Sequence, residues 1–185
     1  MPHSAAMSLR DRHVEAMSRT PRPVGMVTTY GAGGGFGQTA SGFCDIADEP
    51  PALIVCIEDH GLAADAFRLG GAFRLNVLSS GDDHVADAFA LGARIDELAP
   101  GGWDAEAVAG PESVRAVASF ACRLREVRIE ANRLVIVGDV TDAASREDAE
   151  PLLRLNHGYR RVEDLPLPMF PGFPLADHER TTNRR

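Results

Sequence analysis

The sequence predicts a mainly β fold, with a barrel-like sheet and a few flanking helices. Two observations carry this prediction. From Val117 onward the residues favour strands, and the apolar alternation slips by one position between Leu124 and Val127, as it does at a bulge or barrel corner. The run from Leu134 to Val140 then returns as a strand that is apolar on both faces. A pairing of two such long strands suits a barrel.

The size and charge of the chain restrict its class. The 185 residues suit one globular domain, which we place at residues 1–165, followed by a Pro-rich arm or mobile tail at 166–185. The net charge of −8 disfavours binding to nucleic acid or to an anionic membrane. No apolar run has the length of a membrane span, and the first residues lack the apolar segment of a signal peptide. We therefore expect a cytoplasmic protein.

The first elements are a helix and a hairpin. Leu9 to Ser18 is expected to be a short helix, which the prolines of the following Thr-Pro-Arg-Pro segment end. Val24 to Tyr30 is expected to be a strand. Gly31 to Gly37 is so rich in glycine that a phosphate loop must be considered. A Walker loop needs Lys after its last glycine, however, and Gln38 stands there, so we interpret the segment as a flexible hairpin loop.

The rest of the chain alternates short helices with strands. Pro50-Pro51 cannot continue a ladder of hydrogen bonds, so it separates an edge-like segment from the buried strand that follows. Periodicity and stop signals predict the remaining elements. These are strands at Ala52–Ile57, Phe73–Leu78, Pro151–Leu155 and Tyr159–Val162, and helices at Ala63–Leu69 and Val85–Leu91.

A run of small residues before the Pro-Pro pair is the strongest candidate site. Small residues from Gly37 to Gly42 would let a flat ligand lie close to the backbone, whose N–H groups could bond to it. These features alone leave open whether the run binds a ligand or only packs in the sheet. The three cysteines, Cys44, Cys56 and Cys122, form no paired motif, so we expect buried thiols in a reducing compartment and no metal site.

Several segments, taken together, resemble a known family. In order they are RPVGMVTT, GFGQTASGFCDIADEPPALIVCIE, FRLNVL, LVIVGDV and PLLRLNHGYRR, between about residues 10 and 162. This series resembles the flavin reductase-like family, whose FMN-binding fold is a split β-barrel of Greek-key type. The resemblance implies a homodimer that uses NADH or NADPH to reduce FMN, FAD or riboflavin, and a reduced flavin that passes to a separate monooxygenase.

The resemblance also implies site residues. The segment expected to line the flavin ring consists of Gly37, Gln38, Thr39, Ala40, Ser41, Gly42 and Phe43. The strand end expected beside the ribityl chain and phosphate consists of Cys56, Ile57, Glu58 and Asp59, with Asn76 as a further pocket residue. His157 and Tyr159 fall where the family presents residues to the nicotinamide, so they are the catalytic candidates.

The chain departs from the family pattern in ways that leave alternatives open. Glu58 and Asp59 stand where family members carry basic or hydroxyl residues, and carboxylates near a phosphate are unfavourable. Arginines from elsewhere, such as Arg22, Arg68 or Arg74, could hold the phosphate; otherwise flavin binds weakly, or riboflavin is preferred. His157 is shifted by two positions, so it could instead be a turn histidine. A non-catalytic flavin- or haem-binding protein, or a member that has lost flavin, is the alternative function.

Overall fold

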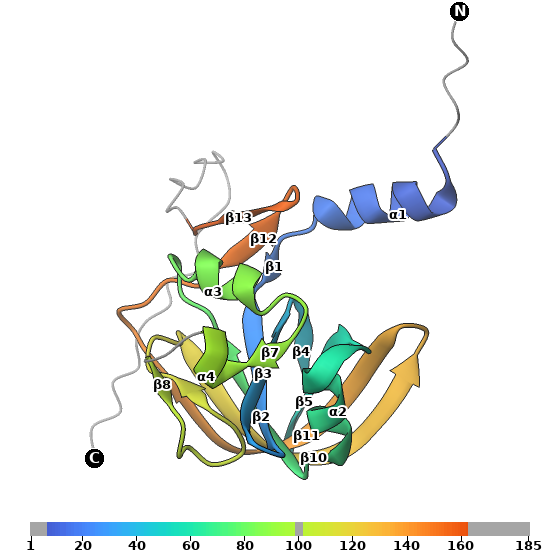
Figure 1. Ribbon diagram of the computed structural model, residues 1–185. Coiled ribbons are helices and arrows are strands. Elements are labelled where there is room, and N and C mark those ends of the chain that lie inside the picture. Colours follow the sequence, from blue (N-terminus) through green and yellow to red (C-terminus); the bar gives the residue numbers. More distant parts are fainter. Residues whose placement is uncertain (1–6, 99–101, 163–185) are drawn as a thin grey trace, which may run out of the picture.

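One large antiparallel sheet dominates the computed structural model, which describes residues 7–98 and 102–162 (Figure 1). The strand order is β4-β5-β11-β10-β6-β2-β3-β7. In chain order the strands are β2 (Gly25–Gly31), β3 (Gly34–Ala40), β4 (Gly42–Asp48), β5 (Pro51–Glu58), β6 (Ala72–Val77), β7 (Ala93–Arg94), β10 (Ala118–Glu130) and β11 (Arg133–Ser145). The mainly β prediction is therefore confirmed.

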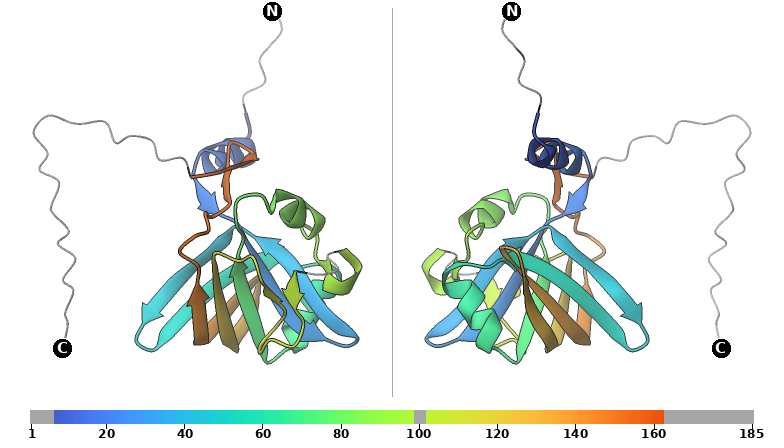
Figure 2. Two further views of the ribbon diagram at one scale, coloured as in Figure 1. Left: turned by 90° about the vertical axis from the view of Figure 1, so that its left-hand side faces the viewer. Right: turned by 90° about the vertical axis from the view of Figure 1, so that its right-hand side faces the viewer.

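Smaller elements surround this sheet. A three-stranded sheet of order β1-β12-β13 lies at one end of it, beside helix α1 (Figure 2). Its strands are β1 (Arg22–Pro23), β12 (Leu153–Leu155) and β13 (Gly158–Arg160), and a separate ribbon pairs β8 (Trp103–Asp104) with β9 (Glu112–Ser113). The helices are α1 (Leu9–Ser18), α2 (Gly61–Leu69), α3 (Asp83–Ala88) and α4 (Ile95–Leu98). Within the described residues, no helix is long and apolar enough to cross a membrane.

The predicted bulge is present in β10. The pairing of β10 with β11 shifts register between Leu124 and Glu126, as the slipped alternation indicated, and a second shift falls between Ala121 and Cys122. These irregularities increase the twist and bend the sheet. Among the described strands the sheet is curled but not closed, with β4 and β7 at its edges, and its two outer hairpins splay apart (Figure 2). This is the expected split barrel.

The concave side of the sheet and α2 enclose the main core. Phe67 of α2 meets Phe73, Leu75 and Ile136 there, all at most 2% exposed. Gly138 of β11 is required at this point, because a Cβ atom built on it would lie 2.5 Å from Cε1 of Phe73. The aromatic ring thus occupies the space that a side chain would need.

Three local expectations differ from the structure. The glycine-rich loop is short, since β2 ends at Gly31 and β3 already begins at Gly34. The helix expected at Val85–Leu91 runs over Asp83–Ala88. Cys44 is exposed and Cys56 is half-buried, and only Cys122 is the buried thiol that we expected for all three. The tail at 166–185 lies outside the described residues.

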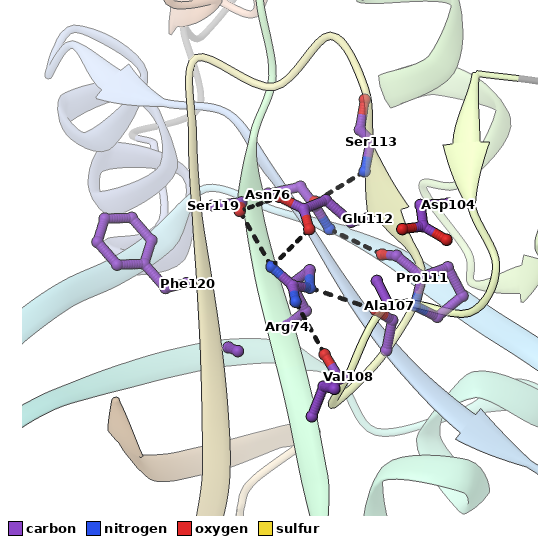
Figure 3. Close-up of polar contacts among 12 residues, drawn as sticks. Arg74, Asn76, Asp104, Ala107, Val108, Pro111, Glu112, Ser113, Ser119 and Phe120 are labelled. Atoms are coloured by element: carbon purple, nitrogen blue, oxygen red, sulfur yellow. Dashed lines mark hydrogen bonds and ion pairs between the residues drawn. The ribbon is translucent and has the colours of Figure 1, made fainter. Parts of the chain in front are cut away.

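A buried polar network fixes the connection between β8 and β10 against the sheet (Figure 3). The Arg74 side chain, 5% exposed, forms an ion pair of 3.0 Å with Glu112 and donates to the carbonyl oxygen of Val108 at 2.9 Å. The Asn76 amide oxygen accepts from the backbone N–H of Ser113 at 3.0 Å. Asn76 is fully buried in this network, and so it is a structural residue rather than the pocket residue that we expected.

The network makes a testable contribution to stability. Replacing Arg74 with Met should lower the free energy of unfolding by about 2–3 kcal/mol, because Glu112 and two carbonyl groups lose their donor while Glu112 keeps partial access to water. The control is Arg123→Met, which removes an exposed ion pair with Asp139 and should change stability much less, because solvent screens this pair. Urea unfolding of both variants measures the difference, and equal losses would contradict the assignment.

Candidate active site

A cavity of about 530 Å³ opens where β3, β4 and β5 meet α3 and the three-stranded sheet. We call it the first cavity. Its lining comprises Arg22, Val24, Thr39, Ala40, Ser41, Gly42, Cys56, Glu58, Ala86, Asp87, Ala90, Arg133, Arg154 and Tyr159. Segments that are far apart in the sequence therefore converge on one space. Its volume is in the usual range for a pocket that binds a small molecule or cofactor.

Four residues of the expected flavin segment line this cavity, from Thr39 to Gly42. The Thr39 hydroxyl already donates to the carbonyl oxygen of Ala86 at 2.7 Å, and the Thr39 backbone N–H donates to that of Phe89 at 3.0 Å. These bonds tie α3 to the end of β3. In the described part of the chain, Ser41 is the hydroxyl of this segment that remains free to bond a ligand.

The structure does not bring the other members of that segment to the cavity. Gln38 is fully buried on the core side, near Ala63 of α2, and neither its Nε2 nor its Oε1 atom has a partner among the described residues. Phe43 packs against the main core, and Gly37 lies beside Met26 and Phe89. Only the end of this segment therefore reaches the cavity, where β3 ends at Ala40 and the chain turns into β4.

At the end of β5, too, some of the expected site residues line the cavity and others do not. Cys56 and Glu58 line the cavity, whereas Ile57 is 1% exposed in the core. The Glu58 carboxylate pairs with Arg133 at 2.7 Å. Asp59 pairs with Arg68 and does not line the cavity. Glu58 and Asp59, the two carboxylates expected to disfavour a phosphate, thus each have an arginine partner.

Tyr159 lines the first cavity. Its hydroxyl donates to Oδ1 of Asp87 at 2.9 Å, and this bond joins β13 to α3. The Arg154 guanidinium carbon lies 5.6 Å from the centre of the tyrosine ring. Burial, and next the Asp87 carboxylate, raise the pKa of Tyr159 to about 12. The phenol therefore stays protonated at neutral pH, where it can donate a hydrogen bond but not act as a base.

His157, the other catalytic candidate, lies outside the first cavity. It occupies the turn between β12 and β13 in a left-handed conformation, with φ of 61°, and its Nε2 atom is 3.7 Å from Glu15. It lines a second cavity of about 370 Å³ beneath α1. The lining of this second cavity comprises His13, Val14, Met17, Ser18, Arg22, Arg133, Arg154 and His157. The turn reading of His157 matches its position.

Three arginines line both cavities: Arg22, Arg133 and Arg154. The sequence suggested Arg22 together with Arg68 and Arg74, but Arg68 is paired on α2 and Arg74 is enclosed in the polar network. Nε of Arg22 is buried without a partner among the described residues. A flavin that carries a phosphate needs such donors, so the residues present fit this group. Arg133 and Arg154 were missed because only the fold brings them here.

The chain is similar to known proteins of one family. The sequence model of the "Flavin reductase like domain" family matches residues 17–163. The FMN reductase (NADH) RutF of Ancylobacter novellus is 32% identical over 160 residues, which cover 85% of this chain and 87% of that protein. A reductase of the same name from Methylorubrum extorquens PA1 is 34% identical over 153 residues, which cover 82% and 76%.

Solved structures share the fold at lower identity. The NADH:FAD oxidoreductase SgcE6 of Streptomyces globisporus, in complex with NAD and FAD fragments, superposes with a TM-score of 0.76 at 22% identity, over 87% of this chain and 98% of that one. The styrene monooxygenase flavin reductase of Pseudomonas putida S12 gives 0.73 at 20% identity, over 84% and 99%.

The Tyr159–Asp87 contact predicts a titration. The pKa of Tyr159 is raised from 10.0, so neutral Tyr159 stabilises the fold below pH 10.0, and this contribution is lost as the pH rises through about 12. Replacing Asp87 with Asn should lower the pKa of Tyr159 only part of the way to 10.0, because burial remains. Ultraviolet difference absorbance of tyrosinate measures it. Asp83→Asn on the same helix serves as control, and an unchanged pKa in Asp87→Asn would refute the contact.

Proposed function

Because this chain belongs to the flavin reductase-like family, we propose that it uses NADH or NADPH to reduce free FMN, FAD or riboflavin. The observation that carries the proposal is the first cavity, in which Thr39 to Gly42 and Cys56 of the family-like segments meet. The curated relatives are named NADH-dependent FMN reductases, which supports FMN and NADH as the pair used here. Bound flavin would supply the hydride acceptor, and the protein supplies position and surroundings.

The residues of the first cavity divide this work. The small side chains from Thr39 to Gly42 leave room for a flat ring close to the backbone. We assign the hydrogen bond to the polar edge of the ring to Ser41 and to backbone N–H groups. Tyr159 is neutral and donates its only O–H to Asp87, so it is placed to orient the nicotinamide by accepting a hydrogen bond at its phenol oxygen or by ring contact. We assign no nicotinamide contact to His157, because it lines the second cavity instead.

The reduced flavin is proposed to leave for a separate monooxygenase. Two structural neighbours support this: one is the reductase of styrene monooxygenase, and another is the reductase component of a two-component tryptophan halogenase. We propose that the protein works in the cytoplasm, where its unpaired cysteines would stay reduced.

The direct test is NADH oxidation with and without added FMN, FAD and riboflavin. We expect oxidation that depends on flavin, and we expect its loss in Ser41→Phe, whose ring would fill the first cavity. Ala143→Phe, at an exposed position of β11 outside that cavity, should keep the activity. Circular dichroism checks that both variants are folded. Flavin-independent oxidation, or full activity of Ser41→Phe, would contradict the proposed site.

We also propose that the protein is a homodimer that pairs through the convex side of β4, β5 and β11. Leu53, Val55 and Ile57 of β5 face the core, so Ile54 and Cys56 face outward. The register places Ile54 beside Val137 and Cys56 beside Val135. This strip of apolar side chains on a sheet face is typical of an interface between subunits. It is continuous with the first cavity through Cys56, so a second copy would approach the flavin.

The dimer can be tested by placing a charge in the strip. Val137→Lys should yield a monomer, because an unpaired ammonium group would be buried between the two sheets. Val114→Lys, which adds the same charge at a 59%-exposed position after β9, should remain a dimer. Light scattering coupled to size-exclusion chromatography gives the mass. A monomeric unmodified protein, or a dimeric Val137→Lys variant, would overturn the proposed interface.

A further inference from the structure

Two arginines face each other across paired strands. In the antiparallel register of β1 and β12, Arg22 is directly opposite Arg154. Like charges in this arrangement repel each other. No ion pair with an acidic side chain joins either guanidinium in the described parts of the chain, at 7–98 and 102–162. Since no acidic side chain among the described residues pairs with either arginine, the pair is better explained by an anion that both arginines bind.

One donor atom of Arg22 also lacks an acceptor. Its Nε–H group is buried and has no acceptor among the described residues. A guanidinium has five N–H donors in a rigid plane, and leaving one of them buried without an acceptor is costly. Arg154 lies against the ring of Tyr159, and both residues line the first cavity.

The second cavity has a lining that is unusual for this protein. The chain carries a net charge of −8, yet the described residues that line this cavity include three arginines and two histidines and no carboxylate. Two acidic groups contact this lining from outside it: Glu58 lies 2.7 Å from Arg133, and Glu15 lies 3.7 Å from His157 and also pairs with Arg19. The three arginines shared by both cavities thus place positive charge where the two spaces adjoin.

We propose that Arg22, Arg133 and Arg154 bind the phosphate groups of a nucleotide whose ring lies in the first cavity and whose remainder extends into the second. The inference rests on the proposed function and adds the ligand class, a phosphate ester or pyrophosphate. Planar guanidinium groups match the oxygens of phosphate in pairs. Val14 and Met17 of α1 give the second cavity an apolar wall, which suits the rest of a dinucleotide.

The phosphate could belong to the flavin or to the nicotinamide nucleotide, and the choice of ligands separates the two. The variant is Arg154→Gln, with Arg22→Gln as a second variant and Arg160→Gln as control. Arg160 is on the adjacent β13 and lines neither cavity. Dissociation constants are measured by calorimetry for riboflavin, FMN, FAD, NADH and reduced nicotinamide mononucleotide.

We expect Arg154→Gln and Arg22→Gln to weaken the affected nucleotide by roughly tenfold or more, as for loss of a charged hydrogen bond. Riboflavin should change little, and Arg160→Gln should resemble the unmodified protein. Weaker binding of FMN and FAD would show that the arginines bind the phosphate of the flavin. A loss for NADH that spares reduced nicotinamide mononucleotide assigns the dinucleotide pyrophosphate. Equal weakening of riboflavin and FMN, with no selective loss for NADH, would overturn the proposal.

Thermal unfolding with inorganic pyrophosphate gives a readout that needs neither flavin nor activity. Pyrophosphate should raise the melting temperature of the unmodified protein and of Arg160→Gln, but not that of Arg154→Gln. Without the anion, Arg154→Gln should melt no lower than the unmodified protein, because one of two opposed charges is gone. If the unmodified protein binds no flavin, the proposed reductase function fails, and the pyrophosphate shift alone decides whether the anion site stands.

Discussion

The long antiparallel pairing of β10 with β11 is the constraint on which the rest of the molecule depends. β10 also pairs with β6, and β11 also pairs with β5, so these two strands join both halves of the sheet. The register shifts in β10 bend this pair, and the bend turns one face of the sheet onto Phe67 and the main core. The other face is left toward solvent at β5 and β11, where Cys56 and Arg133 reach the first cavity.

The site is assembled from the ends of these strands rather than from their middles. α3 is held against the end of β3 by bonds to Thr39 and against β13 by the Tyr159–Asp87 contact. The first cavity therefore has walls from the large sheet, from a short helix and from the three-stranded sheet. Because each wall is attached to the others by hydrogen bonds, a flat ligand would meet a shape that exists before it binds.

The sequence predicted the fold well because its strongest signals are local. The slipped alternation between Leu124 and Val127 and the Pro-Pro break mark β10 and the start of β5 directly. Part of the lining of the first cavity was among the predicted site residues. Carrying over the whole family segment included Gln38 and Ile57. The period of two along β5 could have excluded Ile57 once Cys56 was chosen, but Gln38 is excluded only by its burial in the fold. Asn76 was expected to face a pocket, but the segment at 105–113 covers it. The sequence around Asn76 contains no signal of this long-range contact.

The arginines show what sequence reading cannot supply. Glu58 and Asp59 looked like an obstacle to a phosphate when only their neighbours in the chain were considered. In the fold, Arg133 and Arg68 pair with them, and the arginines opposed at β1 and β12 come from positions more than a hundred residues apart. The effect of a charged residue on a bound phosphate therefore depends on which oppositely charged side chains pair with it in the fold. In this chain Glu58 and Asp59 each have an arginine partner, whereas Arg22 and Arg154 have no acidic partner among the described residues.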